Sequence, residues 1–315
     1  MAPVNHVQVR AAFRPGAVLC LLAAATLVFA PVSRAQEMDH MHHGNEDDVP
    51  VMPSASMIMP MIRNPMLPGA KNLRPSVGEF LPGEGIDPAS LPMAGPREIV
   101  DLANGDTLAL KASLVRKMVA GETFVMYAFN EQIPGPLIRV KRGAEVHVRF
   151  TNRIDMETTV HWHGLRLDNR FDGVPGLTQD AVQPGETFDY TIRFPDDGIY
   201  WYHPHVREDI QQDLGLYGNM LVRPDREPYE DPVHSEQIVT LDDILIEGRE
   251  LVPFGREAAN FSIMGRFGNV LLVNGEQSYE LDARTGEVVR FYLTNVSNTR
   301  TFNLSFGGAP MKLVG

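Results

Sequence analysis

The sequence has 315 residues, a formal net charge of −12 at pH 7 and a hydrophobic fraction of 43%, values typical of globular domains rather than of disordered chains. An acidic chain without a run of Lys and Arg repels nucleic-acid phosphates and anionic lipid surfaces, so the composition disfavours both as partners. Small molecules and cations are the expected partners.

Residues 1–35 have the pattern of a signal peptide. Arg10 and Arg14 precede an apolar run, residues 17–30, and Ser33-Arg34-Ala35 fits a cleavage site. The apolar run is shorter than the roughly 20 residues needed to span a bilayer, so we expect a periplasmic or secreted protein without stable membrane insertion. Cys20, the only cysteine, lies in this segment. The mature chain would then have no thiol for a disulfide, a zinc-thiolate site or a nucleophile.

Residues 36–95 are rich in Met, Pro and small residues without any period, and this composition predicts a flexible tail. Its thioether and imidazole groups could hold copper, although a tail without ligands fits the composition equally well. These groups belong to Met38, His40, Met41, His42, His43, Met52, Met57, Met59, Met61 and Met66.

From Glu98 onward, short runs of β-branched and aromatic residues alternate with Gly, Pro and Asn, which is typical of a body built from β-strands. Residues 146–150 and 188–194 alternate apolar and polar side chains most clearly, so each strand is expected to bury one face. The apolar residues are Val146, Val148 and Phe150 in the first strand, and Phe188, Tyr190, Ile192 and Phe194 in the second.

An internal repeat indicates two copies of one β-sandwich. The first copy contains Asn130-Glu131-Gln132, Gly143-Ala144-Glu145-Val146 and Thr151-Asn152; the second contains Asn274-Gly275-Glu276-Gln277, Gly286-Glu287-Val288 and Thr294-Asn295. Several matches in the same order predict domains over residues 96–226 and 235–315. The second copy is shorter than a usual domain and is expected to end on a strand at residues 312–315, so we expect the chain to be a fragment of a longer one.

Two histidine pairs are the sharpest chemical feature. His161-Trp162-His163 and His203-Pro204-His205 each place two histidines two positions apart. Residues so spaced project from the same face of a strand, so each pair presents two imidazoles to one side while Trp162 packs into the other. Pro204 suits a strand end or edge. Four imidazoles without a carboxylate favour copper or zinc over calcium or magnesium, with copper as the first choice.

These motifs resemble the first cupredoxin domain of multicopper oxidases. The resemblance is carried by His161-Trp162-His163-Gly164-Leu165, Phe171-Asp172-Gly173, His203-Pro204-His205 and Gly215-Leu216-Tyr217-Gly218. It extends over about residues 98–315 and implies an all-β fold of consecutive cupredoxin-like Greek-key sandwiches, the first complete and the second truncated. It also implies a laccase-like or metal-oxidising enzyme that couples one-electron oxidation of phenols or metal ions to reduction of O2 to water.

The family's pattern assigns each histidine a copper ion. His161 would bind the type 2 copper of a trinuclear cluster, His163 and His203 one of the paired type 3 coppers, and His205 the other. Asp172 matches a family carboxylate expected to help deliver protons during oxygen reduction, although an Asp before Gly is also an ordinary loop residue.

The second copy has Asn303 and Ser305 where the first has its histidine pair, so no copper is expected there. The family's last domain carries further histidines and a His-Cys-His segment for the blue type 1 copper, and none of this occurs in the sequence. A blue site needs a cysteine thiolate. We therefore expect this chain to supply half of the cluster and to be inactive by itself.

Two other functions fit part of the sequence. A non-catalytic exported copper-binding or copper-tolerance protein would sequester the metal through the tail and the histidine pairs. A copper nitrite reductase would need a cysteine in its first domain, which this chain lacks. His147, in an alternating strand, and His234, beside Pro232, are expected at the surface rather than in a metal site.

Overall fold

The computed structural model describes residues 6–9, 78–225, 232–306 and 309–314. Most of the predicted signal peptide and the predicted tail up to residue 77, with all its Met and His candidates, lie outside the described residues. His6–Val9 (β1) pairs antiparallel with Tyr279–Asp282 (β15). Within the described part of the chain, no helix is both long and apolar enough to cross a membrane.

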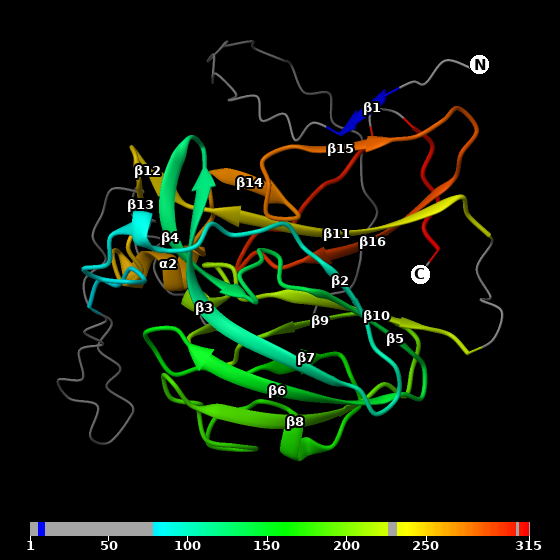
Figure 1. Cartoon of the computed structure of the whole chain (residues 1–315). Coiled ribbons are helices and arrows are strands. Elements are labelled where there is room, and N and C mark those ends of the chain that lie inside the picture. The colour runs from blue at the N-terminus through cyan, green and yellow to red at the C-terminus, as the bar shows by residue number, and fades with distance from the viewer. Residues whose placement is uncertain (1–5, 10–77, 226–231, 307–308, 315) are drawn as a thin grey trace, which may run out of the picture. The chain divides into compact units, whose positions relative to one another are not determined.

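The first repeat is built from two sheets, in agreement with the all-β prediction (Figure 1). One sheet has the strand order β2-β5-β10-β9-β7 and the other β4-β3-β6-β8. Short helices accompany these strands: η1 (Pro88–Ser90) precedes β2, η2 (Asn169–Phe171) lies between β7 and β8, and α1 (Glu208–Gln211) follows β9. The strands are β2 (Ile99–Asp101), β3 (Thr107–Val119), β4 (Glu122–Phe129), β5 (Leu137–Lys141), β6 (Glu145–Arg153), β7 (His161–His163), β8 (Thr187–Arg193), β9 (Gly198–His203) and β10 (Gly218–Arg223).

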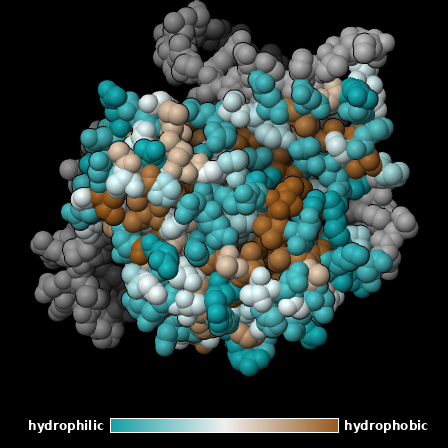
Figure 2. Space-filling model, viewed as in Figure 1, coloured by the Kyte–Doolittle hydropathy of each residue, from teal (hydrophilic) through white to brown (hydrophobic). Residues whose placement is uncertain are grey.

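The core of this repeat lies between the inner faces of the two sheets. The alternation predicted for β6 is confirmed, because Val146, Val148 and Phe150 are buried while His147 and Arg149 are exposed. In and just after β8, the buried apolar residues are Tyr190, Ile192 and Phe194. The face of the molecule in Figure 2 is correspondingly largely hydrophilic, with apolar side chains in separate patches.

The second repeat copies the strand pairing of the first. β11 (Ser235–Ile244) pairs antiparallel with β14 (Val270–Val273) and parallel with β16 (Val289–Asn295). In the first repeat, β3 likewise pairs antiparallel with β4 and parallel with β6. The remaining elements are β12 (Ile246–Glu247), β13 (Glu250–Leu251) and α2 (Ala258–Met264).

Matching asparagines show that the internal repeat is structural. The side-chain oxygen of Asn130 accepts a hydrogen bond from the backbone N–H of Lys111 at 2.8 Å, and that of Asn274 accepts one from Thr240 at 2.9 Å. Both asparagines have a positive φ, 50° and 51°, a conformation that Asn adopts more readily than most residues. The sequence match therefore corresponds to the same turn at the end of equivalent strands.

Buried polar contacts join the two repeats. Asn219 of β10 accepts a hydrogen bond from Thr240 and donates one to Thr294, both at 2.8 Å. The hydroxyl of Tyr217 donates to the buried carboxylate of Asp242 at 2.7 Å. Their hydrogen bonds offset the free-energy cost of burying these polar groups.

Two details differ from the sequence interpretation. Residues 78–95, which we assigned to the flexible tail, lie against the body: Phe80 pairs with Phe254, and Ala94 donates a backbone hydrogen bond to Arg116. The prediction of a strand at residues 312–315 is wrong for the three described residues, because Lys312–Val314 form no strand. A strand requires a neighbour to share its hydrogen bonds, and among the described residues these three have none in a sheet.

Candidate metal centre

Strands β7 and β9 position the histidine pairs. β7 contains only His161-Trp162-His163 and pairs antiparallel with the end of β9, which places His161 opposite His203. Directly opposed residues of an antiparallel pair project from the same face of the sheet. Trp162 points to the other face and is fully buried, as the alternation predicts. Pro204 follows the last residue of β9, so its missing N–H removes no ladder hydrogen bond.

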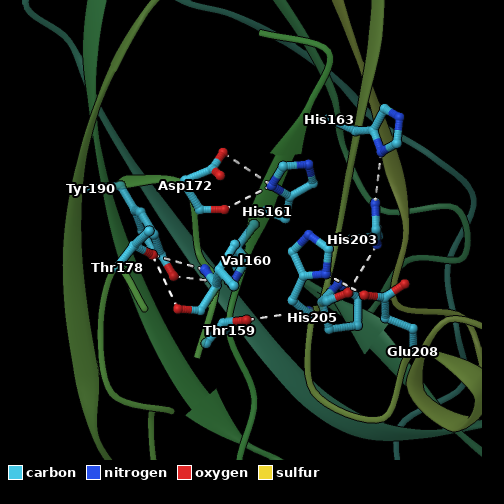
Figure 3. A network of polar contacts seen from close by, with 12 residues as sticks. Thr159, Val160, His161, His163, Asp172, Thr178, Tyr190, His203, His205 and Glu208 are labelled. Atoms are coloured by element: carbon cyan, nitrogen blue, oxygen red, sulfur yellow. Dashed lines mark hydrogen bonds and ion pairs between the residues drawn. The ribbon is translucent and has the colours of Figure 1, made fainter. Parts of the chain in front are cut away.

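The four imidazoles gather at one place (Figure 3). The ring centroid of His161 lies 5.4 Å from that of His163, 5.3 Å from that of His203 and 4.3 Å from that of His205. One ligand atom from each of His161, His163 and His203 lies within 4.8 Å of the others. The structure therefore brings together all four histidines singled out in the sequence.

Three of the four imidazoles are held through Nδ1. The Nδ1 of His161 contacts the main-chain oxygen of Asp172 at 2.7 Å, and that of His203 contacts the oxygen of Pro204 at 2.9 Å. A carbonyl oxygen only accepts, so both Nδ1 atoms carry the proton and Nε2 keeps its lone pair. The Nδ1 of His205 meets the carboxylate of Glu208. Such partners orient metal-binding histidines in many proteins.

His163 is the exception, because its Nδ1 faces another ligand. This atom lies 3.2 Å from the Nε2 of His203. Two nitrogens bound at about 2.0 Å to one tetrahedral ion lie roughly 3.3 Å apart. The separation therefore fits one metal ion held jointly by these two atoms, and without metal it fits a hydrogen bond between them.

Burial favours the uncharged, metal-binding form of His161, His163 and His203. Desolvation lowers the pKa values of His161 and His163, and it lowers the pKa of His203 to about 3, with nearby histidines adding to the effect. Metal ions bind the neutral imidazole, so a site whose histidines resist protonation loses less affinity in mild acid.

Asp172 lies at the site, as the sequence suggested. Besides the main-chain contact, its carboxylate Oδ1 lies 3.3 Å from the Nδ1 of His161. Its side chain is 33% exposed, so the carboxylate borders both the histidine and solvent. Gly173 follows with a φ of +76°, and a Cβ added there would lie 2.1 Å from the oxygen of Val160. Only glycine lets this loop approach the strand that carries His161 so closely.

Two residues of the site were not identified from the sequence. The ring of Trp201 stacks on that of His203, with centroids 4.1 Å apart and planes 20° apart, and it also lies 4.9 Å from that of His163. Glu208 contacts His205 from the first turn of α1. Trp201 could have been predicted only from the register of β7 against β9, which pairs it with His163. Glu208 could have been predicted only by expecting a helical turn directly after His205.

The weaker sequence candidates lie elsewhere. His147 is exposed and contacts the Thr191 hydroxyl at 3.3 Å. His234 is exposed and accepts a hydrogen bond from the backbone N–H of Val288 at 3.0 Å. Asn303 and Ser305 are exposed in a segment with no strand.

Comparison with known proteins agrees with this geometry. Residues 115–227 match the family model described as multicopper oxidase. This range contains both histidine pairs. Residues 115–227 are a multicopper oxidase domain. A solved multicopper oxidase from Pseudomonas thermotolerans shares 34% identity with a TM-score of 0.54, over 64% of this chain and 49% of that one. The predicted cupredoxin-type fold is thus confirmed.

Two curated relatives are similar to parts of the chain. Copper resistance protein A of Pseudomonas syringae pv. tomato is 38% identical over 125 residues, 40% of this chain and 20% of that protein. L-ascorbate oxidase of Nicotiana tabacum is 31% identical over 224 residues, 62% of this chain and 38% of that protein. The chain thus spans a fifth to about two fifths of these relatives.

Proposed function

We propose that this chain contributes half of the histidine ligands of an oxygen-reducing trinuclear copper cluster. His161 would hold the type 2 copper, His163 and His203 one type 3 copper, and His205 the other. The 3.2 Å separation between Nδ1 of His163 and Nε2 of His203 supports this proposal most directly. When bound, the copper ions would supply the redox chemistry that reduces O2 to water with electrons from phenols or metal ions.

The protein side of this chemistry is orientation and proton supply. Backbone carbonyls fix the tautomers of His161 and His203, so their Nε2 lone pairs are aimed before metal arrives. The carboxylate of Asp172, 33% exposed and 3.3 Å from Nδ1 of His161, borders both solvent and a candidate ligand, so it would relay protons from solvent to the site. We assign it that role.

Electron entry requires a residue that this chain does not supply in its mature form. A blue type 1 copper is held by a cysteine thiolate, and Cys20 is the only cysteine, within the predicted signal peptide. We propose that a cysteine-containing segment outside these 315 residues holds that copper and that the chain alone does not turn over. Export to the periplasm or the exterior, directed by residues 1–35, completes the proposal.

Oxygen uptake by the copper-loaded product of the complete reading frame tests the function. A phenol and cuprous ion would serve as reductants. We expect uptake by the wild type and by His147→Ala, a surface histidine control, and a loss of more than about 100-fold in His163→Ala. Tight copper binding without oxygen uptake in the wild type would instead support a copper-sequestering protein.

The two functions also differ in where copper is held. A sequestering protein would lose much of its copper capacity on deletion of residues 36–66, which contain the Met and His groups of the predicted tail. An oxidase would keep the copper of its cluster. Copper per chain, measured before and after the deletion, separates the two cases.

A further inference from the structure

Glu208 has a specific relation to one of the four histidines. Its carboxylate Oε1 contacts the Nδ1 of His205 three residues earlier (Figure 3). Main-chain oxygens hold Nδ1 of His161 and His203 most closely. Among the four imidazoles, His205 is therefore the one whose closest Nδ1 partner is a side-chain carboxylate.

The carboxylate of Glu208 contacts His205 and is not paired with the neighbouring cation. The neighbouring cation, Arg207, makes two hydrogen bonds of 2.8 Å to Asp209 instead. Among the described contacts, His205 is the only side-chain partner of Glu208. A charged acceptor without a competing cation polarises the imidazole more strongly than a carbonyl does.

The segment that carries Glu208 is fixed on two sides. Gln211 of α1 accepts a hydrogen bond from the Thr158 hydroxyl at 2.5 Å and donates one to the oxygen of Glu157 at 2.9 Å, which ties α1 to the residues just before β7. From the second repeat, Asn298 donates to the oxygen of Asp209 at 3.0 Å. Gln211 is fully buried, so the helical turn cannot swing away without breaking satisfied polar contacts.

His205 is itself tethered to the same strand region. Its backbone N–H donates to the Thr159 hydroxyl at 3.2 Å. The backbone is thus fixed while the imidazole, whose side chain is 27% exposed, depends on a second contact for its orientation. Glu208 supplies that contact.

We propose that Glu208 is a positioning residue for the copper ligand His205, an inference that rests on the proposed function. An ionised carboxylate only accepts hydrogen bonds, so it keeps the proton of neutral His205 on Nδ1 and leaves the Nε2 lone pair for copper. The second repeat contributes indirectly, through the contact of Asn298 with α1.

The first test uses the metal-free chain. Nitrogen NMR of histidines labelled with ¹⁵N distinguishes protonated Nδ1 from protonated Nε2. We expect His205 to be protonated on Nδ1 in the wild type and in His147→Ala, the surface histidine control. In Glu208→Ala we expect a substantial population protonated on Nε2.

The second test is copper affinity, measured by competition with a chelator of known affinity. Loss of such a carboxylate partner typically weakens metal binding roughly 10–100-fold. We expect this loss in Glu208→Ala, a smaller one in Glu208→Gln, which keeps an acceptor oxygen without the charge, and a change of less than twofold in His147→Ala. Circular dichroism of the metal-free variants checks that each is folded, and Glu208→Gln carries the test if Glu208→Ala is not.

The outcomes separate this inference from the proposed function. An unchanged His205 tautomer together with copper affinity within twofold of wild type in the folded Glu208 variants would overturn the role of Glu208. A wild-type chain that binds no copper would overturn the proposed function, and the NMR result would still decide whether Glu208 orients His205.

Discussion

The Nδ1 of His161 donates a hydrogen bond to the main-chain oxygen of Asp172 at 2.7 Å, although the two residues lie on different segments, one in β7 and the other in the loop after η2. The loop therefore fixes the tautomer of a candidate copper ligand without using a side chain. Its close approach depends on the next residue, Gly173.

Gly173→Ala is expected to displace this loop. The new Cβ would lie 2.1 Å from the oxygen of Val160, next to His161, and the positive φ of +76° adds strain. We expect a loss of roughly 2–4 kcal/mol in the free energy of unfolding and weaker copper binding. Chemical denaturation and copper titration measure both.

Gly176→Ala is the matched control. Gly176 lies in the same loop with a φ of +71°, but nothing lies within 4 Å of an added Cβ. Only the conformational cost of about 1 kcal/mol should remain, with copper binding unchanged. Equal effects of the two substitutions would show that the close approach to Val160 is unimportant.

His203 is expected to stay uncharged well into the acid range. Burial lowers its pKa to about 3, and the neighbouring histidines oppose a further positive charge. In the metal-free chain its ring resonances should not titrate between pH 8 and pH 5. A proton NMR titration checks this, and a midpoint near the ordinary histidine pKa of about 6.5 would contradict it.

Asp213 should make the fold less stable as the pH rises. Burial raises its pKa to about 7, an effect that Arg266 opposes and Asp243 reinforces. The folded state thus binds this proton more tightly than the unfolded state, whose pKa is about 3.9. The resulting stabilisation is complete below about pH 4 and is lost as the pH rises through 7.

The variant Asp213→Asn isolates this contribution, because an amide does not ionise. Between pH 5 and pH 8, the free energy of unfolding of the wild type should fall by roughly 2–3 kcal/mol more than that of the variant. Urea denaturation at both pH values provides the comparison. Equal changes in the two proteins would mean that Asp213 is already ionised at pH 5 in the folded chain.

Asn274 and Asn130 should have similar effects, because each closes the same turn in its own repeat. Substitution by Ala removes the hydrogen bond to Thr240 or Lys111 and places Ala at a positive φ. We expect each variant to lose roughly 1–3 kcal/mol. Substitution by Gly should cost less, since it relieves the backbone while still losing the bond. Thermal unfolding gives the comparison, and Ala variants as stable as the wild type would argue against a structural role for these turns.

The sequence predicted the features that depend on local pattern. Alternation in residues 146–150 correctly gave the buried face of β6. The repeated motifs predicted two copies of one unit, and the equivalent strand pairing around β3 and β11 supports this, while the domain bounds 96–226 and 235–315 stay a prediction. The spacing of the first histidine pair correctly placed His161 and His163 on one face of β7, whereas His205 of the second pair lies beyond the end of β9. Each of these depends on residues a few positions apart, where backbone geometry alone decides direction.

The features that were missed depend on tertiary structure. Trp201 reaches the site because β7 pairs with β9 in one register, and a sequence does not show that register. Glu208 lies in a helix of only four residues, too short for any helical period to be visible. Residues 78–95 were assigned to the tail by composition, but their order comes from contacts with Phe254 and Arg116, which are distant in the sequence.

The most direct test of copper binding by the histidine pairs is anomalous X-ray diffraction at the copper absorption edge, from crystals of the copper-loaded protein. We predict a copper peak about 2.0–2.2 Å from both Nδ1 of His163 and Nε2 of His203. An occupied copper elsewhere in the protein, with no peak between these two nitrogens, would contradict it.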